Sequence, residues 1–234
     1  MPTLHSLHRV LLQRSFYPLL LATALSSALL LGRVRLSGTP GYIFLFWNIF
    51  LAWVPYLISL AMTALHQQAP LRRWTLALLG AIWFCFLPNA PYLITDLMHL
   101  RHNADAPLIY DVGMLASVAW TGTFLAVASL RMVQTLVRRA YGAAISWLFV
   151  LMVVGCSGFG IYLGRVLRWN SWDVLMNPRA VLADVLPRAF NPLDHPELPG
   201  ITIIFAAIFL ICYSTFPNAG AASAAEQTGL NRLD

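Results

Sequence analysis

Six apolar runs, each long enough to cross a bilayer, are the feature that most limits what this chain can fold into. They cover residues 15–32, 41–64, 74–100, 108–130, 143–166 and 200–217. A helix needs about 20 apolar residues to span a hydrocarbon core of about 30 Å, and only helices and closed barrels satisfy every backbone hydrogen bond in lipid. We therefore predict an all-α, polytopic membrane helix bundle of about six transmembrane helices. It forms a single transmembrane domain over residues 1–217, and residues 218–234 form a disordered tail.

The charge pattern agrees with a membrane location. Only 10% of the residues are charged, and the net charge of +6 comes from arginines scattered at the ends of the apolar runs, which gives no basic stretch for a nucleic acid. Basic residues without acidic neighbours precede span one and follow spans two and four: Arg9, Arg14, Arg72, Arg73, Arg131, Arg138 and Arg139. Cytoplasmic loops carry an excess of basic residues. We predict a multi-pass protein of the cell inner (plasma) membrane with both termini in the cytoplasm.

The third apolar run is interrupted by two prolines after about fourteen residues. Pro88 and Pro91 lack the N–H of a helical hydrogen bond and crowd the carbonyl four residues back, so a continuous helix is not expected. Asn89 is a residue type that caps helix N-termini, and Pro91 then falls in the first turn. We predict that span three is broken at Pro88/Pro91 and that a half-helix capped by Asn89 starts near Ala90.

This second half-helix is expected to be amphipathic. At about 100° per residue, one stripe is polar and the opposite face is apolar. The polar stripe comprises Asn89, Tyr92, Thr95, Asp96, His99 and Asn103, and the apolar face comprises Leu93, Ile94, Leu97, Met98 and Leu100. A lipid-facing Asp is costly, so we expect the stripe to face other helices or a water-filled cavity. The alternative is a kinked helix whose polar end enters the headgroup region.

Other spans add polar residues on the same predicted outer side. Arg165 and Arg168 follow the fifth span, Asp111 opens the fourth, and Asn48 lies in the second. Because charges at membrane depth are stable mainly when paired, we predict that Arg165 pairs with Asp96 or Asp111. If the fifth helix continues, its outer end carries on one face Arg165, Arg168, Trp169 and Trp172, an arrangement also typical of an interfacial belt.

Two further patterns concern the fifth span and the segment after it. The small-xxx-small pair Gly160 and Gly164 predicts close helix packing, with a ligand-lined bend as the alternative. Between spans five and six we predict a short interfacial helix, either passive or acting as a lid. Asn177 would cap it and Pro178 would open it, and its shared face would comprise Val181, Val185 and Leu186.

The strings FLPNAPYLITDLMHL and GIYLGRVLRWNSWDVL resemble the signature stretches of an uncharacterised bacterial family of multi-pass membrane proteins, domain of unknown function 1361. The resemblance covers spans two to six. It implies a membrane location and no particular reaction. It also directs attention to a set of residues in the two strings: Asn89, Pro91, Tyr92, Asp96, His99, Arg165, Arg168, Asn170, Trp172 and Asp173.

Three classes of function remain open. We favour a structural, assembly or accessory membrane subunit with a polar cluster in the outer half of the bilayer, which a membrane protein partner or a second copy would bind. The first alternative is a membrane-embedded enzyme acting on a phosphorylated lipid or isoprenoid carrier, with Asp96 and His99 as base and orienting partner. The second is a small-solute transporter that uses carbonyls freed in the broken span.

The candidate ligands and binding residues follow from these classes. Besides the lipid bilayer, an anionic lipid headgroup or a lipid-linked substrate is a possible partner. The residues of the protein that are candidates for binding such a ligand or its phosphate are Arg165, Arg168, Asn170, Asp173, Asn89, Tyr92, Asp111 and Asn48. A metal site would use Asp96, His99 and His102, although a solvated His102 is the ordinary interpretation. No cofactor motif is evident.

Overall fold

The computed structural model describes residues 8, 11–69, 71–100, 107–191 and 193–216, and this part of the chain is built from helices without a strand. Six of its segments are long and apolar enough to cross a membrane, three of them being α2 (Phe16–Ser37), α3 (Phe44–Gln68) and α6 (Leu108–Tyr141). The others are α7 (Ala143–Arg165), α10 (Glu197–Thr215) and the composite segment Arg73–His99. The predicted polytopic helix bundle is confirmed. The tail over residues 218–234 lies outside the described residues.

The helices extend beyond the apolar runs that predicted them. The first continues to Ser37 and the fourth to Tyr141, although their apolar runs end near residues 32 and 130. Loss of hydrophobicity marks where a helix leaves the hydrocarbon, whereas the helix itself ends where its backbone hydrogen bonds end. For α6 that point is Gly142, whose φ of 87° allows the chain to turn directly into α7.

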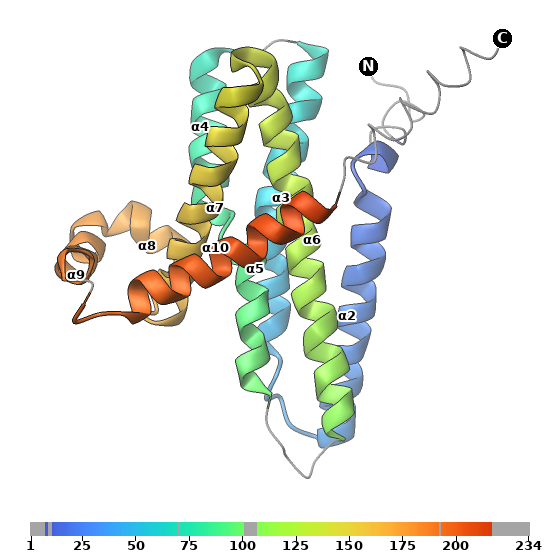
Figure 1. Ribbon diagram of the computed structural model, residues 1–234. Helices are drawn as coiled ribbons and strands as arrows, with labels where there is room; N and C mark the ends of the chain where they lie inside the picture. The colour runs from blue at the N-terminus through green and yellow to red at the C-terminus, as the bar shows by residue number, and fades with distance from the viewer. Residues whose placement is uncertain (1–7, 9–10, 70, 101–106, 192, 217–234) are drawn as a thin grey trace.

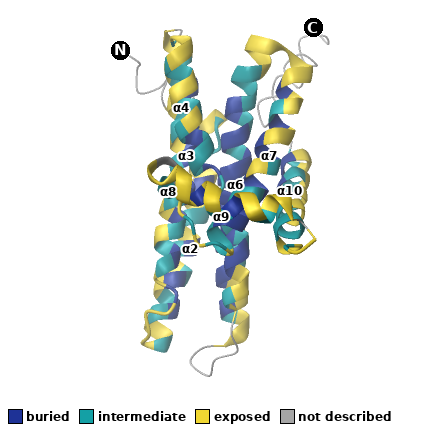
Figure 2. Ribbon diagram, turned by 90° about the vertical axis from the view of Figure 1, so that its left-hand side faces the viewer, coloured by how far each residue is buried: buried dark blue, intermediate teal, exposed yellow. Residues whose placement is uncertain are grey.

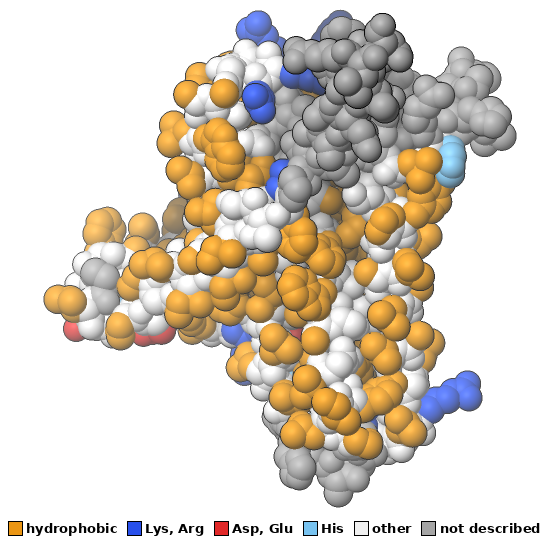
Figure 3. All heavy atoms as spheres, turned by 45° about the vertical axis from the view of Figure 1, so that its right-hand side comes forward, with side chains coloured by type: hydrophobic (Ala, Val, Ile, Leu, Met, Phe, Trp, Pro, Cys, Tyr) orange, Lys and Arg blue, Asp and Glu red, His pale blue; other side chains and the backbone are white. Residues whose placement is uncertain are grey.

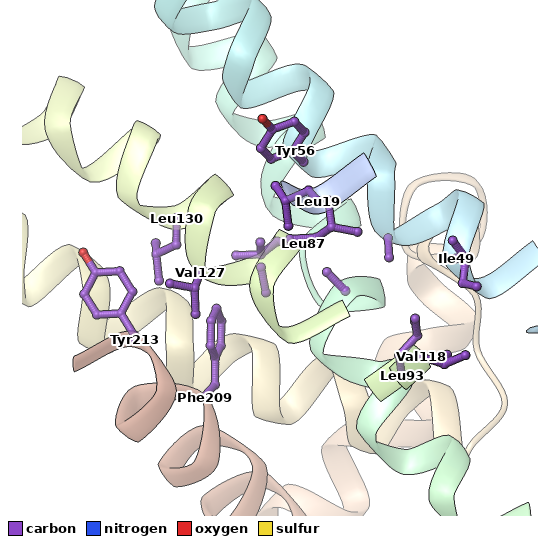
Figure 4. Packing of buried hydrophobic residues seen from close by; sticks show 14 of the residues in the cluster. Leu19, Ile49, Tyr56, Leu87, Leu93, Val118, Val127, Leu130, Phe209 and Tyr213 are labelled. Atoms are coloured by element: carbon purple, nitrogen blue, oxygen red, sulfur yellow. The ribbon is translucent and has the colours of Figure 1, made fainter. Parts of the chain in front are cut away.

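The long helix α6 is the centre of the bundle. Of its most apolar stretch 61% is buried, against at most 39% for the other five candidate spans, and Figure 2 shows the buried colour concentrated along it. It contacts α2, α3, α7, α10 and the broken third span. The core around it includes Tyr56, Leu87, Leu130 and Phe209 (Figure 4).

The last long helix, α10, crosses α7 and α6 obliquely instead of running parallel to them (Figure 1). It approaches α7 closely at Gly158, where an added Cβ would lie 2.3 Å from the Thr202 carbonyl oxygen. Glycine at this position therefore permits direct backbone contact between the two helices.

Two short helices, α8 (Ser171–Met176) and α9 (Pro178–Phe190), connect α7 to α10 and project to one side of the bundle (Figure 1). The predicted helix with Pro178 in its first turn is present as α9. Val181 and Val185 are buried against the end of α7, whereas Leu186 is exposed.

The outer surface is apolar over most of the bundle. Figure 3 shows hydrophobic side chains across the face presented, with basic side chains at its upper end and a few lower down. Exposed large residues such as Leu21, Leu148 and Ile203 lie on three different helices. A surface of this kind requires lipid as its solvent, so the chain is a multi-pass membrane protein.

Candidate functional site in the broken third span

The third membrane segment is broken where the two prolines predicted it. Helix α4 (Arg73–Phe86) ends before Pro88, α5 (Asn89–Tyr92) makes one turn, and a 3₁₀ helix, η1 (Leu93–His99), completes the segment. Asn89 does not cap the new helix, and that prediction was wrong. Its Nδ2 instead donates to the Phe86 carbonyl at 2.9 Å and to the Ser171 hydroxyl at 2.8 Å. The side chain points back because the Ala90 N–H bonds to Leu87, which leaves the Phe86 carbonyl for the Asn89 amide.

Glycines of two neighbouring helices hold this broken segment. An added Cβ at Gly122 of α6 would lie 2.3 Å from the Ala90 carbonyl oxygen, and one at Gly160 of α7 would lie within 2.8 Å of Pro88. A Cβ at Gly164 would meet the Tyr92 ring at 3.2 Å. Close packing at Gly160 and Gly164 is therefore confirmed, and the element packed there is the broken segment.

The 3₁₀ geometry changes which side chains share a face. Residues three apart are eclipsed in a 3₁₀ helix, so Leu93 aligns with Asp96. Thr95 and Asp96 are buried, while Leu97 and Met98 are exposed, as the predicted polar stripe requires. Leu93, predicted on the apolar face, is instead fully buried. Asn103 lies outside the described residues.

Asp96 is the centre of a compact polar cluster and is only 1% exposed. Its Oδ1 accepts a hydrogen bond from Arg165 Nη2 at 2.6 Å, and its Oδ2 accepts one from Asn48 Nδ2 at 3.0 Å. Arg165 also donates to the Thr95 hydroxyl, with Nε at 2.9 Å, and its guanidinium lies 4.4 Å from the centre of the Tyr92 ring. The predicted pairing of Arg165 with Asp96 is confirmed.

His99 is close to this cluster without being bonded into it. Its Nδ1 lies 3.8 Å from Asp96 Oδ1, beyond hydrogen-bond distance. This nitrogen is buried and has no hydrogen-bond partner among the described residues, and the ring packs on Phe44 at 5.0 Å between centroids. A base and its orienting partner need a separation of about 2.6–3.2 Å, so the two side chains do not form a coupled pair in this conformation.

Asp111 belongs to a second buried ion pair, with Arg33 of α2. The contact is bidentate: Arg33 Nε bonds to Oδ1, and Nη2 lies 3.3 Å from Oδ2. Arg33 is 3% exposed and lies within α2, although the apolar run of the first span ends at residue 32. The sequence feature that predicts burial of Arg33 is its spacing from Ser26 and Leu30. This spacing places all three residues on one face of a first helix that extends past residue 32.

Arg168 does not join the cluster. Helix α7 ends at Arg165, and Arg168 adopts a left-handed conformation with φ of 59° and is exposed. The backbone N–H of Trp169 then bonds to the Leu163 carbonyl at 3.0 Å. The expected shared face of Arg165, Arg168, Trp169 and Trp172 required a continuing helix and is not formed.

Asn170 and Asp173 start α8. Asp173 Oδ2 accepts hydrogen bonds from the Asn170 backbone N–H at 2.8 Å and from its side-chain amide at 3.0 Å, which is a capping-box arrangement. Nearby, Trp169 Nε1 donates to Asp184 Oδ2 at 2.9 Å. This bond, together with Arg188, holds the pKa of Asp184 below its usual range.

A cavity of about 320 Å³ lies beside the polar cluster, between α3, α4, α5, α7 and the start of α8. Of the predicted site residues, its lining includes Asn48, Asn89, Tyr92 and Asn170, and Ser171 adds a hydroxyl. Asp96, His99 and Arg165 are not among its lining residues. The charged groups thus lie behind the cavity wall, with Asn48 and Tyr92 between them and the space.

For a metal ion, the described residues contain no group of three His, Cys, Asp or Glu side chains in ligand geometry. Of the proposed metal set, His102 lies outside the described residues.

The chain matches no curated protein and no solved structure. Residues 47–212 match the model of a family described as protein of unknown function, DUF1361. The match runs from most of α3 to most of α10 and includes the polar cluster and the cavity. By that match, the chain belongs to this family of proteins of unknown function.

Proposed function

We propose that this protein is a structural, assembly or accessory subunit of the plasma membrane, and that its buried charges fix the packing of its helices. The observation that carries the proposal is the Asp96 cluster. Both carboxylate oxygens and the Arg165 guanidinium are engaged with residues of three helical segments, α3, η1 and α7. Charged groups that are already paired hold segments together and leave little capacity for a substrate.

The geometry gives the alternative functions less support. Arg165 bonds to Asp96 and Thr95, and Arg168 is exposed outside the cavity, so these two arginines do not converge on one phosphate site. Of the two carbonyls that the prolines free, those of Phe84 and Leu87, the Leu87 carbonyl accepts a hydrogen bond from the Ala90 N–H. An accessory role needs neither a free base nor a free carbonyl.

The orientation belongs to the same proposal. With both termini in the cytoplasm, the Asp96 cluster lies in the outer half of the bilayer, and Arg72, Arg138 and Arg139 lie at the cytoplasmic ends of their helices. A partner protein or a second copy would then approach from within the membrane, where the apolar faces of the bundle are exposed.

A double-mutant cycle tests whether the Asp96–Arg165 pair is structural. Removing one member of a buried pair costs about 3–5 kcal/mol of unfolding free energy, so Asp96→Ala and Arg165→Ala should each destabilise the protein strongly, with the double variant far less destabilised than their sum. The matched control is the partly exposed pair Asp184–Arg188 of α9, for which coupling below about 1 kcal/mol is expected.

The opposite result would identify a reactive site. Residues held for catalysis often reduce stability, so a higher unfolding free energy in Asp96→Asn would overturn the structural role. Association is tested separately, by blue-native electrophoresis of a chromosomally tagged copy extracted in mild detergent. A tagged species larger than the monomer that is lost in Arg165→Ala supports an accessory subunit, and migration of the wild type as a monomer alone contradicts it.

A further inference from the structure

The cavity opens sideways, toward the lipid. Two of its lining residues are strongly exposed, Trp47 on α3 and Cys156 on α7, and both lie within helices of the membrane-spanning set. The deeper wall is formed by Pro88 and Asn89 of the broken segment. A molecule that enters between α3 and α7 therefore comes from the bilayer.

The polar groups in the wall are uncharged, and their hydrogen-bonding capacity can be assigned. Asn48 and Asn89 both line the cavity, and each uses its Nδ2 as a donor, Asn48 to a carboxylate and Asn89 to a backbone carbonyl. Because those partners can only accept, the amide orientations are fixed by chemistry. Each residue is left with an Oδ1 that has no donor within the described residues.

A molecule that fills the cavity would have to supply hydrogen-bond donors to these two amide oxygens. Phosphate and carboxylate groups offer only acceptors when ionised, so they could accept from the Tyr92 and Ser171 hydroxyls of the wall but would leave both amide oxygens without a donor. Hydroxyl groups donate and suit both oxygens. The remaining wall is largely apolar and aromatic, with Leu51, Phe84 and Phe159 beside the polar end.

We propose that this cavity is a binding site for an uncharged membrane amphiphile whose head carries hydroxyl groups. The hydroxyls donate to Asn48 and Asn89, and the first part of an acyl chain lies along the aromatic wall. A volume of about 320 Å³ is at the lower end of ligand sites, which run from about 300 to 1,000 Å³. It holds the head and the start of a chain, and the rest of the chain stays in the bilayer.

This site is independent of the proposed accessory role. The charge pair behind the wall stabilises the fold whether or not the cavity is occupied. Asn48 is shared, because its Nδ2 bonds to Asp96 while its Oδ1 faces the cavity, so the variants that test the cavity are placed at other residues. Loss of lipid binding without loss of stability would therefore separate the two proposals.

Native mass spectrometry in phosphatidylcholine nanodiscs tests the site with two lipids that share their acyl chains. The probes are dioleoylglycerol, which has a free hydroxyl, and dioleoylphosphatidate, which has an ionised phosphate. We expect the protein to retain dioleoylglycerol in preference to phosphatidate. A third arm with monoglucosyl-dioleoylglycerol shows whether a larger hydroxylated head is accepted as well.

Variants at the mouth locate the binding. Cys156→Phe should narrow the entrance from α7 and lower dioleoylglycerol occupancy about tenfold, equivalent to about 1.4 kcal/mol. Met152→Phe is the matched control, because Met152 is an exposed residue one turn earlier on α7 that does not line the cavity. Leu51→Trp narrows the cavity from α3 and should reproduce the loss.

Three outcomes would overturn the proposal. Equal retention of both lipids would show that the amide oxygens do not select a donor, and preferential retention of phosphatidate would reverse the assignment of the head. Equal loss in Cys156→Phe and Met152→Phe would place the lipid elsewhere on the surface of α7.

Discussion

Gly122 and Gly113 lie on the same helix, but a methyl group added at each would meet different surroundings. At Gly122 the new Cβ would lie 2.3 Å from the Ala90 carbonyl oxygen and 2.9 Å from the Leu93 Cβ, whereas at Gly113 nothing lies within 4 Å. Ordinary contact begins at 3.4 Å, so the Ala90 oxygen would have to recede by about 1.1 Å, the difference between 3.4 and 2.3 Å. That oxygen belongs to the backbone of α5, so the whole short helix must move.

The expected magnitudes follow from two opposing effects. Replacing Gly by Ala within a helix stabilises it by up to about 1 kcal/mol, and this gain is common to both positions. Overpacking a dense interior costs about 1–3 kcal/mol, and this cost arises only at Gly122. Gly113→Ala should therefore be slightly more stable than the wild type, and Gly122→Ala should be less stable than Gly113→Ala by about 1–3 kcal/mol.

The assay is equilibrium unfolding in mixed micelles with increasing SDS fraction, followed by far-ultraviolet circular dichroism. Because the propensity gain is shared, the difference between the two variants isolates the packing of α5 against α6. Unfolding free energies that agree within about 0.5 kcal/mol, the usual range for innocuous substitutions, would refute the close contact at Gly122 and with it the placement of the broken segment.

Two further predictions concern the end of α7 and its contact with α9. A β-carbon in the left-handed conformation of Arg168 costs about 1–2 kcal/mol, so Arg168→Gly should raise the unfolding free energy and Arg168→Ala should not; equal values would show that the position is unstrained. The pKa of Asp184 is lowered by Trp169 and Arg188, so its stabilising effect is present above the ordinary value of 3.8 and is lost as the pH falls through the lowered value. The difference in melting temperature between the wild type and Asp184→Asn should therefore be constant well above pH 3.8 and shrink as the pH falls below it, and a difference that does not change with pH would contradict the assignment.

Several features were predictable because they depend on local chemistry. The membrane spans follow from apolar length, and the break in span three follows from the missing N–H groups of Pro88 and Pro91. The pairing of Arg165 with an aspartate follows from the cost of an isolated charge in lipid. Each inference uses only neighbouring residues or a transfer free energy.

Other features were wrong or were missed because they depend on the neighbouring helices. Asn89 was expected to cap a helix, but its side-chain amide donates to the Phe86 carbonyl and to the Ser171 hydroxyl instead. Arg33 follows the end of the first apolar run, but its helix continues and places it opposite Asp111. A one-dimensional pattern contains no information on which helix lies alongside another, and that neighbour determines the bond.

The sequence alone determined a six-span helical membrane protein with a broken third span and a need to pair its buried charges. The tertiary structure decided which charges pair, since Asp96 forms an ion pair with Arg165 and Asp111 forms one with Arg33. It also decided that η1 is a 3₁₀ helix, which turns about 20° more per residue than an α-helix and so brings Leu93 into line with Asp96. The physical reason is that apolar length and proline chemistry act within one segment, whereas the rotation of each helix about its axis is set by the side chains it packs against.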